Sequence, residues 1–143
     1  MTERMNEECA FCEIGRGTVP ASIVYEDALT LAFIDFRQFH PGHVLVIPRK
    51  HLADVRELDE ITGAAVMATV ARVTAAVGKA FPNQGMSLWH SIGPAAFQEV
   101  PHLHIHIHPR LVGDRLLRVY PAEIPSSTSR EREEYSAILR EFL

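Results

Sequence analysis

Histidine and aliphatic side chains alternate strictly over seven consecutive positions of this chain, in the segment HLHIHIH at residues 102–108. Such alternation is typical of a half-buried β-strand, because successive side chains of a strand point to opposite faces of the sheet. The three aliphatic side chains are expected to face a core, and the four imidazoles to line the other face. A polar strand face more usually carries Lys, Thr, Glu or Ser, so this row of rings indicates a metal site, a catalytic site or an accident of surface composition.

The rest of the chain predicts an α+β domain. Asp59 is the expected N-cap of a long helix, rich in Ala and Val, that ends near Phe81. A second, amphipathic helix is predicted from about Ser129. Strands outnumber helices and short connections dominate, which favours a mainly antiparallel, five-stranded sheet with one long helix and shorter ones. Besides the histidine segment, the predicted strands are residues 22–25, 29–34, 44–47 and 86–92.

Composition limits the classes of protein to which the chain can belong. It has 143 residues, 47% of them hydrophobic, which predicts a single domain over residues 1–143. A formal net charge of −4 argues against general nucleic-acid binding, because no basic excess is present to neutralise a phosphate backbone. No apolar run approaches the ~20 residues that span a bilayer, so no membrane association is expected. The N-terminus MTERMNEECAFC does not resemble a secretory signal, and a cytoplasmic location is expected.

The histidine row as a whole does not form one metal site. Rings at positions i and i+2 of a strand lie ~6.7 Å apart at Cα and can share an ion, whereas rings at i and i+4 are about twice as far apart. A His-x-His pair with a distant third ligand, as in a metal-dependent oxygenase or hydrolase, stays open as an alternative. Cys9 and Cys12, spaced as CAFC, indicate a metal or redox role in a reducing compartment.

A catalytic role suits three rings at a spacing of two. An imidazole has an ordinary pKa of ~6.5 and is mostly uncharged at neutral pH, so it is a good nucleophile. Its attack on phosphorus gives a phospho-imidazole that water hydrolyses readily, which divides one difficult step into two easier ones. One neighbouring ring can stabilise charge on a phosphate oxygen, and the other can hold the orientation of the nucleophile. His102, His104 and His106 supply this arrangement.

Three segments in order resemble the histidine triad (HIT) superfamily. QEVPHLHIHIHPR, at residues 98–110, is similar to its histidine signature, which bacterial members follow with Pro-Arg. AFIDFRQFHPGHVLVIPRKH, at residues 32–51, is similar to its acidic strand end, Pro-Gly-His turn and apolar strand. CAFCEIGRGTVPASIVYED, at residues 9–27, resembles the N-terminal segment of many bacterial members. The resemblance covers a motif-bearing core, residues 9–110, and leaves a C-terminal extension, residues 111–143.

This resemblance implies a nucleotide-binding hydrolase or transferase that forms a homodimer and takes a purine nucleotide as its substrate. It attacks the α-phosphate of nucleoside phosphoramidates or dinucleoside polyphosphates through a covalent nucleotidyl-histidine intermediate. His104 is then the nucleophile, His106 binds the α-phosphate oxygens and Gln98 lies in the phosphate loop. Asp35 would bind both ribose hydroxyls, because one carboxylate accepts two O–H donors. Phe36 would pack against the base.

The resemblance also implies a zinc ion, as in some bacterial members. Four nitrogen and sulfur ligands make a closed, tetrahedral site that is structural rather than catalytic, so no metal is needed for the chemistry. His43 is expected to be a structural hydrogen-bonding residue and His108 an exposed residue at the strand end. The implied zinc ligands are Cys9, Cys12, His51 and His102.

Three departures from the family pattern cluster where a leaving group would lie. Phe97 precedes Gln98 where the family commonly has Gly, and Ser91 replaces an Asn or Gln near the scissile bond. Glu99 stands where many members have Ser or Thr; it would repel phosphate if ionised, or donate a proton if its pKa were raised. All four residues are predicted to contact the nucleotide. The departures keep a second function open, that of a nucleotide-sensing or scaffolding module with weak or no catalysis.

Overall fold

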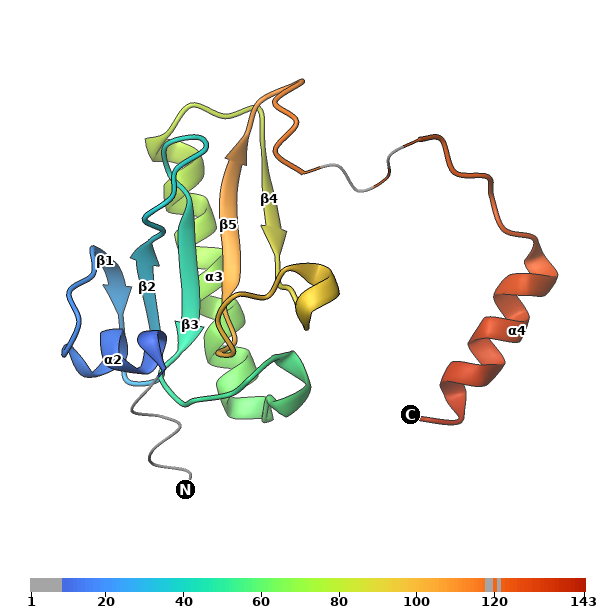
Figure 1. The fold of residues 1–143 in the computed structure, drawn as a ribbon, viewed down its shortest axis with the longest axis horizontal. Coiled ribbons are helices and arrows are strands. Elements are labelled where there is room, and N and C mark those ends of the chain that lie inside the picture. The colour runs from blue at the N-terminus through green and yellow to red at the C-terminus, as the bar shows by residue number, and fades with distance from the viewer. Residues whose placement is uncertain (1–8, 118–119, 121) are drawn as a thin grey trace.

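The computed structural model describes residues 9–117, 120 and 122–143, and its centre is one antiparallel sheet (Figure 1). The strands lie in the order β1-β2-β3-β5-β4, and every pairing is antiparallel, so the predicted α+β class and five-stranded sheet are confirmed. β5 carries the later part of the histidine segment and lies between β3 and β4, so it is paired with a strand on each side. The strands are β1 (Ile23–Glu26), β2 (Thr30–Ile34), β3 (Val44–Pro48), β4 (Gly85–Trp89) and β5 (Ile105–Arg110).

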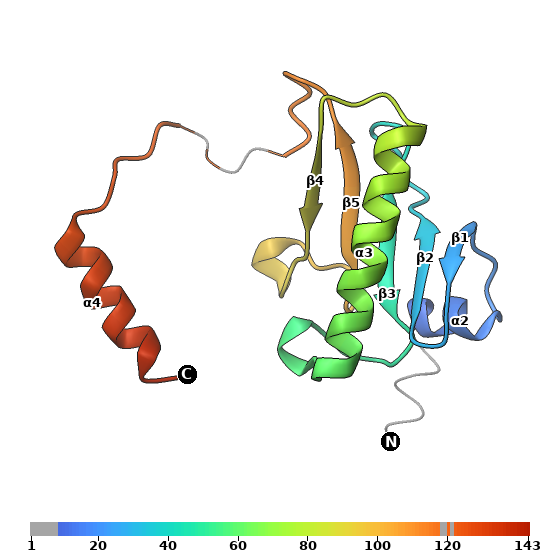
Figure 2. The same cartoon turned by 180° about the vertical axis from the view of Figure 1, so that it is seen from behind.

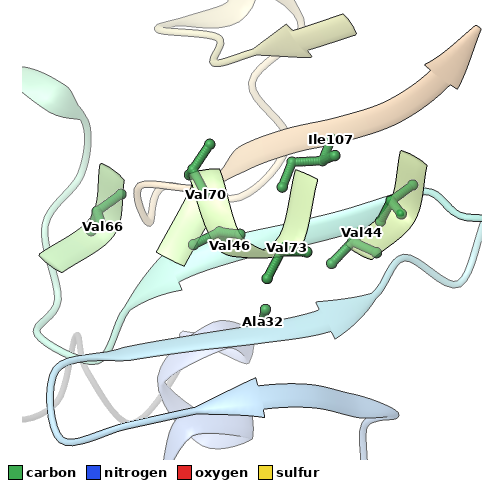
Figure 3. Packing of buried hydrophobic residues seen from close by; sticks show 8 residues of the cluster. Ala32, Val44, Val46, Val66, Val70, Val73 and Ile107 are labelled. Atoms are coloured by element: carbon green, nitrogen blue, oxygen red, sulfur yellow. The ribbon is translucent and has the colours of Figure 1, made fainter. Parts of the chain in front are cut away.

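The long helix α3 (Glu60–Ala80) covers one face of the sheet (Figure 2). It begins as predicted, because the Asp59 side chain accepts a hydrogen bond from the backbone N–H of Thr62. Its length and composition would suffice to cross a membrane, but its valine face packs on the sheet, as in the core helix of a folded domain. That face meets the sheet in a cluster of aliphatic side chains (Figure 3): Ala32, Val44, Val46, Val66, Val70, Val73, Val77 and Ile107.

The opposite face of the sheet is covered near its β1 edge by a short helix, α2 (Ala10–Arg16) (Figure 1). The pattern did not predict this helix, because its N-cap is a thiol: Cys9 Sγ accepts from the backbone N–H of Cys12. Gly17, with φ of 76°, ends it in the left-handed conformation that glycine adopts without strain. A second core forms here from Cys9, Phe11, Cys12, Leu31, Phe33, Leu45 and Ile47. Helices therefore pack on both faces of the sheet, and α2 covers only the part of its face near β1.

The first part of the histidine row lies against this second layer, because the Phe11 ring of α2 contacts the rings of His102 and His104. β5 begins at Ile105, so the first two histidines precede the strand. The prediction that His108 is exposed was wrong: its exposed fraction is 0%, and its ring lies 4.7 Å from that of His43 and 5.7 Å from that of His40. The period-two pattern predicts a polar face, but it does not say whether other elements cover that face.

The chain beyond β5 leads to the helix α4 (Ser129–Arg140), which stands away from the sheet (Figures 1 and 2). The helix predicted from near Ser129 is thus confirmed. Thr128 and Glu131 form a reciprocal capping box at its start. Two 3-10 turns complete the described elements, η1 (Val55–Glu57) and η2 (Pro94–Ala96).

Truncating the β5 side chain under α3 tests the layered core. We expect Ile107→Ala to lower the free energy of unfolding by about 2–5 kcal/mol, because this fully buried side chain packs against α3. The matched control is Ile61→Ala on the exposed side of α3, with an expected change below about 0.5 kcal/mol. Urea denaturation followed by circular dichroism measures both. Equal effects of the two substitutions would contradict this description of the core.

Candidate functional site

A cleft of about 540 Å³ opens on the face of the sheet opposite α3. Its floor is formed by side chains of the histidine segment and of the second core, and its rim by the loops that follow β2 and β4. Leu117, from the start of the C-terminal extension, also lines it. The predicted site residues that line this cleft are Asp35, Phe36, Ser91, Phe97, Glu99, His104 and His106.

His104 presents one defined ring nitrogen to the cleft. Its Nδ1 lies 2.6 Å from the backbone carbonyl oxygen of His102. Because a carbonyl only accepts, Nδ1 carries the proton and Nε2 carries the lone pair. Burial lowers the pKa of His104, so the ring is uncharged at neutral pH. Phe11 meets this ring edge-on at 5.0 Å between centroids and helps to hold its orientation.

His106 belongs to a hydrogen-bonded chain that starts at the backbone of Arg37. His43 Nδ1 donates to the Arg37 carbonyl at 3.2 Å, and the remaining His43 nitrogen lies 2.9 Å from His106 Nδ1. His43 is thus a hydrogen-bonding residue, as predicted. The indole of Trp89, opposite His106 across the β4–β5 pair, stacks on its ring at 4.4 Å. Burial, and then the neighbouring His104 and His43 rings, lower the pKa of His106 to about 3.

Asp35 follows the last residue of β2 and turns its carboxylate into the cleft. The side chain is 8% exposed, and its Oδ1 accepts the backbone N–H of Arg37 at 2.8 Å. Its Oδ2 lies 3.8 Å from His43 Nδ1. Phe36 beside it is 90% exposed, so its ring is available to a planar ligand.

Gln98 holds the loop before the histidine segment in shape. Its Oε1 accepts the backbone N–H of Gly93 at 2.9 Å, and its Nε2 donates to the carbonyl of Ala53 at 3.0 Å. The structure does not bring the Gln98 side chain to the cleft wall formed by the other predicted residues. A contact between this loop and phosphate stays a prediction.

Glu99 makes an ion pair across the mouth of the cleft. Its Oε2 lies 2.5 Å from Arg37 Nη2, and its Oε1 lies 3.4 Å from Arg37 Nη1. The hydrogen bond from this guanidinium lowers the pKa of Glu99. The alternative of a raised pKa, which would make Glu99 a proton donor, was therefore wrong, and the carboxylate is ionised.

The four predicted zinc ligands lie together beside the cleft. Their ligand atoms are all within 4.8 Å of one another, and both thiols are free. Cys9 Sγ lies 3.4 Å from His102 Nδ1, and Cys12 Sγ lies 3.2 Å from His51 Nδ1. His102 Nε2 donates to the Pro48 carbonyl at 2.9 Å, so Nδ1 turns its lone pair toward the thiols. This donor set fits a tetrahedral metal ion with two nitrogen and two sulfur ligands.

A second group with ligand atoms within 4.8 Å of one another is Asp35, His43 and His106. Its two rings are already joined to each other by the hydrogen bond between His43 and His106. The His43–His106 pair is therefore arranged as a hydrogen-bonded chain rather than as an open metal site.

Sequence reasoning missed two cleft residues that shape the site. Trp89 carries no signal beyond its place in a predicted strand, although it is the single tryptophan of the chain and lies two positions before Ser91. Arg37 carried no signal beyond its place after Asp35 and Phe36, because its partner Glu99 is 62 positions away.

Comparisons with known proteins agree with this geometry. The family model described as HIT domain matches residues 16–112. Protein hit of Bacillus subtilis is 38% identical over 104 residues, which cover 73% of this chain and 72% of that protein. Adenosine 5'-monophosphoramidase hnt1 of Schizosaccharomyces pombe is 37% identical over 102 residues, covering 71% of this chain and 74% of that protein.

The similarity extends to the three-dimensional structure. The crystal structure of a member of the HIT family from Bacillus subtilis superposes with a TM-score of 0.88 at 30% sequence identity, and the match covers 95% of this chain and 97% of that one. The matched family model, the sequence identities and the shared fold together establish that this chain belongs to the HIT family.

Proposed function

We propose that this protein hydrolyses, or transfers, a nucleoside monophosphate taken from nucleoside phosphoramidates or dinucleoside polyphosphates, through a covalent intermediate on His104. The observation that carries the proposal is the tautomer of His104, whose Nε2 lone pair is free for attack while Nδ1 is bound to the His102 carbonyl. Hydrolases occur in this family, as the name of the fission yeast relative states.

The proposed reaction has two steps. In the first, His104 Nε2 attacks the α-phosphorus, and the P–N bond of a phosphoramidate or the P–O bond of a polyphosphate breaks. The leaving group keeps the bonding electron pair, and an amine takes up a proton from the solvent. In the second step, water attacks phosphorus and loses a proton to the solvent, the bond to Nε2 breaks with its electron pair returning to the His104 ring, and the nucleoside monophosphate leaves. An acceptor other than water would give transfer instead of hydrolysis.

The hydrogen-bonded chain gives His106 a charge-dependent role in this proposal. His43 donates to a carbonyl, so its other nitrogen accepts from His106 Nδ1, and His106 Nε2 carries a lone pair. His106 can donate to a phosphate oxygen only after it takes up a proton, and a nearby phosphate anion favours that form. Asp35 would accept the ribose hydroxyls and Phe36 would pack on a purine base.

Removal of the His104 ring tests the proposal. We expect His104→Ala to lower AMP release from adenosine phosphoramidate and from a dinucleoside polyphosphate by about 10³-fold or more, because no other group replaces the nucleophile. Calorimetric binding of AMP should largely survive, since Asp35 and Phe36 are unchanged. His40→Ala, outside the cleft, is the control and should keep activity within a few-fold. Near wild-type turnover by the His104 variant would overturn the proposed mechanism.

The same measurements of AMP release and AMP binding distinguish the proposed hydrolase from a second candidate function, that of a nucleotide-sensing or scaffolding module. The specific observation in its favour is the rim, where Phe97 and the ionised Glu99 replace the Gly and the hydroxyl residue common in the family. In that case the wild-type protein would bind AMP and release none from either substrate.

We also propose that Cys9, Cys12, His51 and His102 hold a structural zinc ion. When bound, the ion would link α2 to the segments that carry His51 and His102. It would also hold the backbone of His102, whose carbonyl sets the tautomer of His104. The supporting observation is the His102 ring, which donates through Nε2 and turns its Nδ1 lone pair toward the thiols.

Zinc removal should therefore act first on stability. We expect chelation, or the substitution His51→Ala, to lower the thermal unfolding temperature by at least about 5 °C, because binding energy at a closed site is folding energy. Re-added zinc should restore the chelated wild-type protein and not the variant. Elemental analysis of the purified protein measures the metal directly. A metal-free protein with an unchanged unfolding temperature would contradict the proposed zinc site.

The homodimer expected from the resemblance stays a prediction, and α4 gives it support. This helix and the residues after it carry apolar side chains that are more than half exposed, Tyr135, Ile138, Leu139 and Phe142. We expect light scattering to give twice the chain mass of 16.0 kDa, and Leu139→Glu with Phe142→Glu to shift the protein toward the monomer. A wild-type protein that is monomeric at assay concentrations would refute it.

A further inference from the structure

The rim of the cleft carries two features that the proposed chemistry does not use. Phe97 has φ of 62°, a left-handed conformation in which a bulky side chain is strained and glycine is not. Phe97 is 87% exposed and lines the cleft, so no core packing compensates for that strain. Strained residues gather at binding sites, where the strain serves a contact with a ligand.

The second feature is the carboxylate of Glu99, two residues further along the same loop. It is ionised and exposed, and it lines the same cleft as Phe97. Glu99 and the nucleophile His104 line the same cleft. A group that leaves phosphorus opposite His104 can therefore reach this carboxylate.

An exposed aromatic ring beside a carboxylate is a suitable receptor for an organic cation. The rim already holds one organic cation, which belongs to the protein itself. The guanidinium of Arg37 lies 5.2 Å from the centroid of the Phe36 ring and forms the ion pair with Glu99. Since the Arg37 and Glu99 side chains are 62% and 64% exposed, an incoming cation can compete for this carboxylate.

The charged side chains around the cleft also favour a cationic leaving group. Among the described residues that line it, the acidic and basic side chains other than histidines are two carboxylates, Asp35 and Glu99, and one guanidinium, Arg37. Carboxylates thus outnumber guanidinium groups among these side chains, which disfavours a polyphosphate chain and favours a single phosphate with a cationic leaving group.

We propose that Phe97 and Glu99 form a leaving-group subsite that selects substrates whose leaving group carries an ammonium or guanidinium ion. This inference rests on the proposed function and narrows its substrate class to nucleoside phosphoramidates of basic amines. Glu99 binds the cation and Phe97 offers its ring face. Arg37 competes with the cation of the leaving group, because its guanidinium pairs with Glu99 when no such substrate is bound.

Three adenosine phosphoramidates of nearly equal length test the subsite, with cadaverine, hexylamine and aminovalerate as the cationic, neutral and anionic leaving groups. An exposed charge pair changes binding by about threefold, and a comparison of the cationic with the anionic leaving group counts this effect twice, so that the two factors multiply. We therefore expect kcat/KM for the cationic substrate to exceed that for the anionic one by about tenfold. This ratio should fall as salt is raised, because exposed charges are screened.

Variants that should change the cation-to-anion ratio of kcat/KM in opposite directions make the test specific. Glu99→Gln should bring the cation-to-anion ratio to within about twofold of unity, whereas Arg37→Gln should raise it. Phe97→Gly should lower kcat/KM for the cationic substrate most, while it relieves backbone strain and leaves the protein at least as stable. Glu60→Gln, which removes an equal charge outside the cleft, is the control and should leave the ratio unchanged. Thermal unfolding confirms that each variant is folded.

The outcomes distinguish this inference from the proposed function. If the wild-type protein releases no AMP from any of the three substrates, the proposed function fails. If AMP is released but Glu99→Gln leaves the ratio at its wild-type value, the subsite is refuted and the proposed function stands. A wild-type preference for the anionic substrate would also refute it, and would assign leaving-group binding to Arg37.

Discussion

The hydrogen bond from His104 Nδ1 to the carbonyl of His102 is the interaction on which the rest of the site depends. It fixes the tautomer that leaves Nε2 with a lone pair, and it does so with a backbone group that cannot change its own protonation. His102 is held in turn, because its ring donates to the Pro48 carbonyl and faces the two thiols. The orientation of the nucleophile is thus set by buried contacts around β3 and α2, outside the cleft itself.

Those contacts require a sheet that is covered on both faces. α3 packs on one face through its valines, and α2 with the second core covers part of the other. Three rings of the histidine row are buried and that of His106 is half-buried. Burial is the first cause of the lowered pKa values of His104, His106 and His108. A strand with the same sequence on an open face would keep its rings near their ordinary pKa, and more of them would be charged at neutral pH.

Local signals made much of this predictable. Apolar runs indicated the strands, Asp59 marked the start of α3, and the spacing of Cys9 and Cys12 indicated ligands that the fold does bring near His51 and His102. The helix α2 was not predictable from capping rules, because its N-cap is a thiol rather than Ser, Thr, Asp or Asn. The burial of His108 depends on partners from the loop before β3 and from β4, which no local pattern specifies. The ion pair between Arg37 and Glu99 was not predictable either, because no local pattern specifies two partners so far apart in the sequence.

The floor and the rim of the cleft differ in what holds them, and this separates chemistry from selectivity. On the floor, His104 and Asp35 are buried and each is fixed by a backbone hydrogen bond. On the rim, Phe97 and Glu99 are exposed, so a change there removes little packing and costs little stability. The rim can therefore take side chains that choose the leaving group, even a strained phenylalanine, while the floor keeps the nucleophile in place. In this chain the rim carries a ring and a carboxylate, which are the groups that recognise a cation.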